Sequence, residues 1–131
     1  MGKNPDCRVV TTSYGAELAE ENSRAVRDLL EATAFAAVFG ELAVTDEDAP
    51  VQLSTDSRSV KGWKLSSPHR GGMAAAGVGG PLTGKGAHLM VIDDPIKNRE
   101  EAESVTARTR VWDWYTSTAY TRLEQAGAVF L

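Results

Sequence analysis

The sequence is poor in the features that mark secreted, membrane-bound or zinc-binding chains. Its 131 residues include one cysteine and two histidines, too few for an intrachain disulfide or a cysteine-based zinc site. No apolar run approaches the roughly 18 residues that a membrane span needs, and residues 1–6 do not resemble a secretory signal. These absences predict a soluble, cytoplasmic protein with no membrane partner.

An excess of positive charge is also missing. The chain carries 14 Lys and Arg against 18 Asp and Glu, for a net charge of −4, whereas modules that bind nucleic acid over their whole surface are usually basic. Any contact with DNA should therefore involve a local patch. The length fits one domain over residues 1–131, and hydrophobic residues, at 42%, suffice for a core.

Strand and helix patterns alternate along the chain. β-Rich residues 8–14 precede Gly15 and a segment with helical spacing of its apolar residues. Glycine-rich residues 71–86 are too flexible for a helix, although the small residues 73–78 can form a strand. The pattern predicts a strand at 8–14, a helix at 15–31, a short helix to about Phe39, an exposed acidic loop at 44–50, and short strands near 61–65 and 73–78.

The clearest pattern is the apolar run at residues 88–92, which stops at Asp93, Asp94 and Pro95. Such a run is typical of a strand buried on both faces of a parallel sheet. Asn98, with Glu101 three residues later, predicts the start of a long helix over 98–123. Its apolar face should contain Ala102, Val105, Trp112, Tyr115, Ala119 and Leu123, and a buried strand should follow at 128–131. This alternation predicts an α/β fold with a mostly parallel sheet.

The paired acids Asp93 and Asp94 are the first candidates for chemistry. Ligands of open α/β sheets bind at the carboxyl ends of the strands. One carboxylate there can hold the water shell of Mg²⁺ while a second orients an attacking water. The alternative is that both residues only end the strand and cap the turn at Pro95.

Residues 79–86 match the spacing of a phosphate-binding loop except at the last position, where Gly86 replaces Ser or Thr. A strand, not a helix, is predicted to follow, which argues against a true phosphate loop. Lys85, on a flexible glycine loop that is expected to stand beside the acidic strand end, could still reach a phosphate, including one on a neighbouring subunit. The alternative is a solvated turn lysine.

Other residues favour structural roles. Cys7 precedes an apolar run and should pack there, and His69 and His88 lack further ligands at metal-binding spacing. Aromatic residues at 112–120 could stack on bases. Trp112 and Tyr115, however, lie on the predicted apolar helix face, which favours core packing.

The segment Gly-Gly-Pro-Leu-Thr-Gly-Lys-Gly-Ala-His-Leu-Met-Val-Ile-Asp-Asp-Pro-Ile-Lys-Asn (79–98) resembles a signature of tailed-phage terminase large subunits. The similarity extends to residues 11–14, 101–104, 114–115 and 121–123, and so spans nearly the whole chain. These proteins are the ATP-driven motors that package viral DNA. The resemblance identifies the chain as the central part of their ATPase domain.

The resemblance implies a three-layer, RecA-like P-loop NTPase core that lacks the Walker A strand and loop. Asp93 would be the Walker B acid that binds Mg²⁺ through water in the ATP complex, and Asp94 would be the catalytic acid. Many relatives have Glu at the position of Asp94. Lys85 occupies a loop position that is often Arg, where it would act across a subunit interface, although Lys lacks the bidentate fork of Arg.

The resemblance also implies that the chain is a fragment. The Walker A loop would lie upstream and a nuclease domain downstream, so the isolated piece should not hydrolyse ATP. The expected partners are double-stranded DNA, portal protein, the small terminase subunit and further copies in a ring, in the cytoplasm of a bacterium that carries a phage or prophage. Three alternatives remain: a helicase or other P-loop ATPase, a Mg²⁺-dependent nuclease that uses Asp93 and Asp94, and a non-catalytic packing or binding module.

Overall fold

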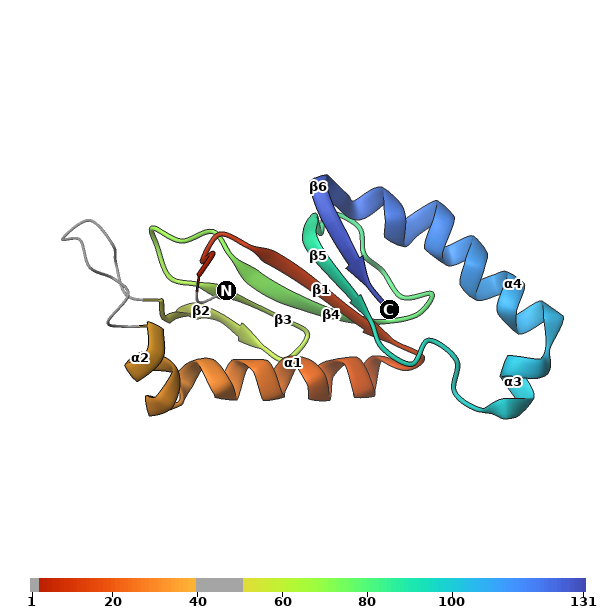
Figure 1. Ribbon diagram of the computed structural model, residues 1–131, viewed down its shortest axis with the longest axis horizontal. Coiled ribbons are helices and arrows are strands. Elements are labelled where there is room, and N and C mark those ends of the chain that lie inside the picture. The colour runs from red at the N-terminus through yellow and green to blue at the C-terminus, as the bar shows by residue number, and fades with distance from the viewer. Residues whose placement is uncertain (1–2, 40–50) are drawn as a thin grey trace.

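The computed structural model describes residues 3–39 and 51–131 and contains a six-stranded sheet flanked by helices (Figure 1). The predicted acidic loop at 44–50 lies outside the described residues. Most elements follow the predicted order along the chain. They are β1 (Arg8–Ser13), α1 (Ala16–Glu31), α2 (Thr33–Phe39), β2 (Leu53–Ser59), β3 (Gly62–Leu65), β4 (Gly72–Gly77), β5 (Ala87–Ile92), α3 (Arg99–Glu103), α4 (Val105–Trp114), a π-helical turn (Tyr115–Ala119), a 3₁₀ turn (Tyr120–Arg122) and β6 (Leu123–Phe130).

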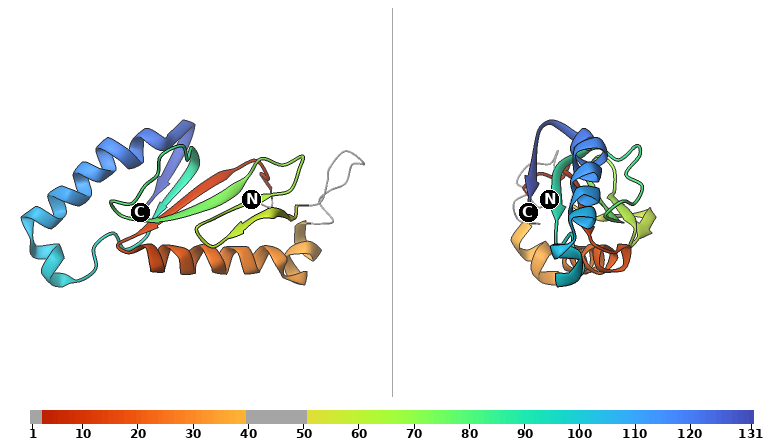
Figure 2. Two further views of the ribbon diagram at one scale, coloured as in Figure 1. Left: turned by 180° about the vertical axis from the view of Figure 1, so that it is seen from behind. Right: turned by 90° about the vertical axis from the view of Figure 1, so that its right-hand side faces the viewer.

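The sheet has the strand order β2-β3-β4-β1-β5-β6. The pairs β4–β1, β1–β5 and β5–β6 are parallel, while β2–β3 and β3–β4 are antiparallel. The predicted α/β fold with a mostly parallel sheet is confirmed. β5 lies between β1 and β6, one position from the edge of the described sheet. Figure 2 shows α1 beside the β3–β4 part of the sheet and α4 at the β5–β6 end.

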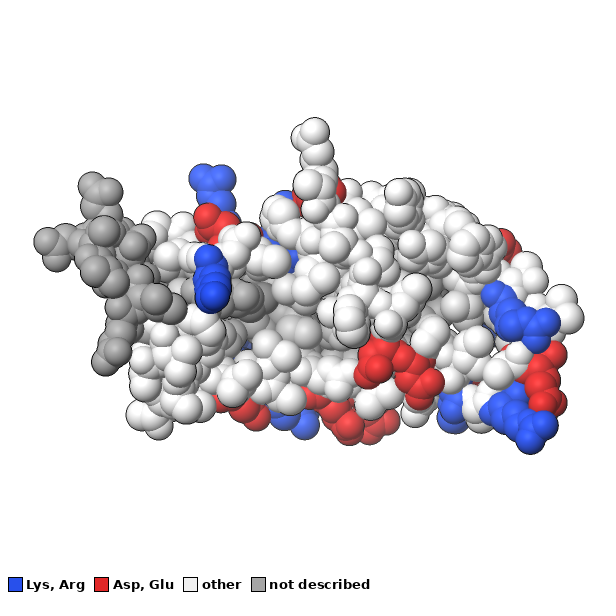
Figure 3. Space-filling model, in the orientation of Figure 1, with Lys and Arg blue, Asp and Glu red and all other residues white. Residues whose placement is uncertain are grey.

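Helix α1 covers one face of the part of the sheet that β3, β4 and β1 form. Its half-buried Val26 and Leu30 pack against a core cluster of Trp63, Leu65 and Met73. The opposite side of the helix carries charges to solvent, and acidic residues follow the lower border of the molecule in Figure 3, where α1 lies. This amphipathic pattern is what the sequence spacing predicts for residues 15–31.

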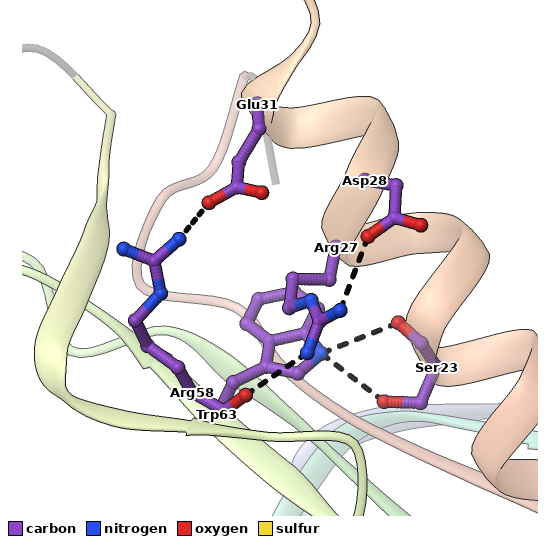
Figure 4. Close-up of polar contacts among 6 residues, drawn as sticks. All are labelled: Ser23, Arg27, Asp28, Glu31, Arg58 and Trp63. Carbon is purple, nitrogen blue, oxygen red and sulfur yellow. Dashed lines mark hydrogen bonds and ion pairs between the residues drawn. The ribbon is translucent and has the colours of Figure 1, made fainter.

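Polar contacts fix α1 to the antiparallel strands (Figure 4). Trp63 is 1% exposed, and its indole Nε1–H donates to Oγ and to the carbonyl oxygen of Ser23, at 3.1 and 3.4 Å. The guanidinium of Arg27 donates to the carbonyl oxygen of Arg58 at 3.0 Å, and Arg58 pairs with Glu31. Since a buried indole N–H without a partner costs free energy, the bonds to Ser23 specify how β3 docks on the helix.

The other face is covered by α4 and the π-helical turn. Val10, Met90 and Ile92 form a core cluster with Trp114 and Ala119. The strand register places Met73 beside Val9 and Met90 beside Val10, so the two core clusters lie on opposite faces. Helices on both faces of a mostly parallel sheet are compatible with a three-layer α/β fold.

The helical region after β5 differs from the prediction of one helix over 98–123. Asn98 is the predicted cap, accepting from the Glu101 N–H at 2.9 Å. The helix then breaks at Ser104, whose hydroxyl caps the new helix by accepting from Ala107 N–H at 3.3 Å. The π-helical turn adds a residue to one turn and rotates the apolar face. Trp112 is therefore 63% exposed, and Trp114 is buried instead.

Burial at the β5–β6 end also differs from the prediction. β5 was expected to be buried on both faces, but only Ala87, Met90 and Ile92 are buried, and His88 is exposed. β6 begins at Leu123 rather than at 128, and its Phe130 is 67% exposed. The reason is that α1 lies beside β3 and β4, so that the same face of β5 and β6 has no helix over it among the described residues. In that part of the chain, no helix is long and apolar enough to cross a membrane.

Candidate functional site

Asp93 and Asp94 immediately follow β5, at the carboxyl edge of the parallel strands. The Asp93 N–H donates to the carbonyl oxygen of Thr12 at 2.8 Å, and the Tyr14 N–H donates to the carbonyl oxygen of Asp94 at 2.9 Å. These bonds continue the β1–β5 ladder past the end of both strands. The backbone of the acidic pair is thus held by the sheet, while both aspartates remain exposed to solvent.

Asp94 has a left-handed backbone conformation, with φ of 49°. Side chains of adjacent residues in a regular strand point to opposite faces, so two neighbouring acids can share a site only where the strand ends. The positive φ ends the regular alternation at Asp94, just before Pro95. Asp is among the non-glycine residues that tolerate this region best, so the turn can carry a carboxylate.

Asn22 of α1 positions the Asp93 carboxylate. Its side-chain Nδ2 donates to Asp93 Oδ2 at 3.2 Å. Sequence reasoning missed this residue. The available signal was helical spacing: Asn22 lies four residues from both Leu18 and Val26, which places this polar residue on the apolar side of α1.

The residues at this edge fit a magnesium ion that is held mainly by water and phosphate. Mg²⁺ commonly uses one or two carboxylates together with phosphate oxygens and waters. The amide of Asn22 contacts one oxygen of Asp93 and leaves Oδ1 for such a role. Within residues 3–39 and 51–131, no group of three or more His, Cys, Asp or Glu side chains could enclose a metal ion.

The glycine loop at 79–86 connects the two edges of the sheet. It begins after β4 at the carboxyl edge, where the Gly80 N–H donates to the carbonyl oxygen of Gly77 at 2.8 Å. Leu82 is fully buried in the core, and β5 begins at Ala87 with no intervening helix. The predicted strand, rather than the helix N-terminus of a phosphate-binding loop, therefore follows these residues.

Lys85 lies at the amino end of β5, and Asp93 and Asp94 lie at its carboxyl end. A six-residue strand spans roughly 20 Å, so the structure does not bring Lys85 together with the acidic pair in one chain. The expectation that Lys85 stands beside the acidic strand end is wrong. Lys85 is close to Asp93 and Asp94 in sequence, but the length of β5 separates it from them in space.

A cavity of about 450 Å³ opens next to the acidic pair. Tyr14, Pro95, Asn98 and Arg110 are among its lining residues, but neither aspartate reaches it. It is formed mainly where α3 and α4 meet the loop that leaves β5. The carboxylates therefore face solvent, not this cavity.

Both histidines make hydrogen bonds that involve the backbone. His88 Nδ1 accepts the Arg8 N–H at 3.1 Å, and the His69 N–H donates to the carbonyl oxygen of Ser66 at 3.0 Å. Among the aromatic residues, Tyr115 packs against the core as predicted. Trp112 is exposed, and its ring centroid lies 5.6 Å from that of Tyr115.

Neither a known protein-family model nor any curated protein matches this chain.

Proposed function

We propose that this chain is the central part of the ATPase domain of a DNA-translocating motor of the phage terminase large-subunit kind. The observation that carries the proposal is the acidic pair Asp93–Asp94 at the carboxyl end of β5, inside the parallel part of the sheet. Nucleotides and other ligands of open α/β sheets bind at this edge. The resemblance of residues 79–98 to the terminase signature supports the same reading.

In this proposal Asp93 holds the water shell of Mg²⁺ and Asn22 fixes the orientation of its carboxylate. The ion, when bound with ATP, neutralises charge that develops on the phosphates during transfer. Asp94 orients the attacking water and accepts its proton as the bond to the γ-phosphorus forms and ADP leaves. Its backbone turn frees it from the alternation of β5.

The phosphate-binding loop would come from another part of the parent protein, in a RecA-like arrangement. The outer edge of β6 pairs with no strand among the described residues. A strand that added there in parallel would bring its own loop to the edge that carries Asp93 and Asp94. The domain would work in a ring with DNA, portal protein and the small terminase subunit, inside a bacterial host.

Lys85 lies at the opposite edge from the acidic pair of its own chain, so a catalytic role requires a neighbouring subunit. We propose that it approaches the nucleotide phosphate of the next copy in the ring. In assembled parent protein, Lys85→Ala should lower DNA-stimulated ATP hydrolysis, and mixing it with an Asp94→Asn variant should show whether the two act in different subunits. Unchanged hydrolysis by Lys85→Ala would leave it as a solvated lysine.

The nuclease alternative is supported less well. Two-metal hydrolysis needs several converging carboxylates, and the described residues offer no group of three or more potential ligands. The isolated 131-residue chain should bind ATP weakly or not at all, because the phosphate loop is not among its residues. Calorimetry tests this: a low-micromolar dissociation constant would require roughly 7–8 kcal/mol from other groups.

The test of the proposed function uses the parent protein with its phosphate loop. Asp94→Asn should keep nucleotide affinity while hydrolysis falls by roughly 10²–10⁴, as expected for the loss of a general base. Asp93→Asn should also weaken Mg²⁺-nucleotide binding. Asp113→Asn, an exposed aspartate on α4, is the matched control and should change neither quantity. Normal turnover by Asp94→Asn would remove Asp94 from the mechanism.

A further inference from the structure

A second concentration of charge lies at the amino edge of the sheet, away from the acidic pair. A cavity of about 800 Å³ opens there, and its lining includes Arg8, Lys64, His69, Arg70, Lys85 and His88. Among the described residues, Asp6 is the one acidic residue in the lining. In a chain with a net charge of −4, four Lys and Arg side chains around one cavity form a local positive patch. We call these four residues, Arg8, Lys64, Arg70 and Lys85, the basic cluster.

The strand register explains why two of these cations meet. Lys64 of β3 and Arg8 of β1 both lie opposite Gly72 of β4, so the three residues form one row across the sheet. Because paired residues point to the same face, both cations lie on the face opposite α1. Gly72 places no side chain between them. Neighbouring strands are about 4.8 Å apart, which puts the two backbone positions roughly 10 Å apart.

Two loops bring the remaining cations to the same place. Arg70 precedes β4, and its backbone N–H is fixed by Asp6 Oδ1 at 2.8 Å. Asp6 is thereby engaged with a backbone donor, not with a cationic side chain. Lys85 lies on the glycine loop at 79–86, where its backbone N–H donates to the carbonyl oxygen of Leu82 at 3.1 Å. The anchoring of these loop backbones keeps both cations at the rim of the cavity.

Three of the four residues of the basic cluster have no ion-pair partner among residues 3–39 and 51–131. Arg8 pairs with Glu124 at 2.7 Å. Lys64, Arg70 and Lys85 form no ion pair within the part of the chain that the structure describes. Arg8, Lys64 and Arg70 are exposed. At the upper left of Figure 3, over the amino end of β1, basic side chains project from the surface with an acidic side chain between them. Three unpaired cations at one cavity favour an anionic ligand.

We propose that the basic cluster binds the phosphate backbone of a nucleic acid. Exposed cations spread over two strands and two loops suit a chain of phosphates that passes over the surface, which Lys and Arg contact as solvated charges. A single nucleotide phosphate is typically cradled by converging backbone N–H groups at a helix N-terminus, and among the described residues none from the first turn of a helix lines this cavity. The inference rests on the proposed function, because it gives the DNA of that motor a place at this edge, but its test uses Lys64 and Arg70 and depends neither on ATP hydrolysis nor on Lys85.

The experiment measures binding of a fluorescent DNA duplex to the 131-residue chain by anisotropy over a range of salt concentrations. Wild type should bind with an affinity that falls steeply with salt. The double variant Lys64→Ala/Arg70→Ala should flatten the slope of log affinity against log salt by about 2, since each phosphate contact contributes about 0.9. Circular dichroism melting should show that both chains remain folded.

The matched control is Arg24→Ala/Arg110→Ala, which removes two exposed arginines from α1 and α4 that form no ion pair among the described residues. Both double variants lower the net charge from −4 to −6, so only position differs. Equal slopes for the two double variants would overturn the proposal. So would a wild-type chain that does not bind the duplex at about 50 mM salt. A third arm adds ATP as competitor: displacement of the duplex at micromolar ATP would assign the cluster to nucleotide phosphates instead.

Discussion

The two ends of the parallel strands carry opposite charge and are built differently. At the carboxyl edge, Asp93 and Asp94 sit on backbone that is hydrogen-bonded to β1, and Asn22 holds one carboxylate. At the amino edge, Lys64 and Arg70 extend from a short strand and a loop without ion-pair partners in the described chain. The side chains of the acidic edge are thus held by more contacts, whereas Lys64 and Arg70 at the basic edge are exposed to solvent.

This difference matches the two kinds of chemistry proposed. Orienting a metal ion and a water requires groups fixed to fractions of an ångström, whereas attracting a phosphate backbone requires charge density more than exact geometry. It also shows that net charge is a poor guide to local function. A chain that is acidic overall can still present a basic surface, because the fold separates its charges.

The largest expected effect is a loss of stability when Trp63, which supports the amino edge of the sheet, is replaced. Trp63 is buried next to Lys64 and anchors β3 to α1. Trp63→Ala should lower the free energy of unfolding by about 3–5 kcal/mol, because it removes a large buried ring and leaves a cavity. Urea denaturation measures the loss. Trp112→Ala, at an exposed tryptophan, is the control and should cost less than about 0.5 kcal/mol.

A smaller effect is expected at the carboxyl edge when Asn22 is replaced. In the parent protein, Asn22→Ala should weaken Mg²⁺-nucleotide affinity by about 10-fold or more, in the range seen when a residue that orients a metal ligand is lost. Stability should not fall, because Ala favours helix and Asn22 is only half-buried. Arg24→Ala, on the same helix, provides the comparison. Unchanged affinity in Asn22→Ala would mean that Asp93 needs no positioning by α1.

The smallest effect distinguishes the two buried tryptophans. Trp63 Nε1–H has partners on Ser23, whereas Trp114 Nε1 is buried with no hydrogen-bond partner. Trp63→Phe should therefore lower the free energy of unfolding by about 1–2 kcal/mol more than Trp114→Phe does, because only the first substitution leaves a buried hydrogen-bonding group without its partner. Thermal unfolding of both variants gives the difference. Equal losses would show that the bond to Ser23 contributes nothing net.

Local sequence patterns were sufficient to predict several of the strands and helices and their alternation along the chain. The strand at 8–14, the helix at 15–31 and the end of β5 at Asp93 were all correct, since hydrophobic periodicity and glycine positions determine them. The helix over 98–123 was wrong because a serine cap at Ser104 and a π-helical turn interrupt the 3.6-residue period. Neither interruption changes the apolar pattern enough to be visible in sequence.

Contacts between distant segments could not be predicted in the same way. Asn22 and Asp93 are 71 residues apart, and only the packing of α1 on the sheet brings them together. The basic cluster depends on strand register, since Lys64 and Arg8 meet through Gly72. Lys85 was placed near the acids because it is close in sequence, whereas the direction of β5 puts it at the other edge.

The most direct test of the account measures two ligands on two variants of the parent protein. Mg²⁺-nucleotide affinity and DNA-duplex affinity are determined for Asp93→Asn and for Lys64→Ala/Arg70→Ala under one set of conditions. The account predicts that Asp93→Asn weakens nucleotide binding by about 10-fold or more and leaves DNA binding intact, and that the double variant does the reverse. If both variants weaken the same ligand, the two edges do not have separate functions and the account is contradicted.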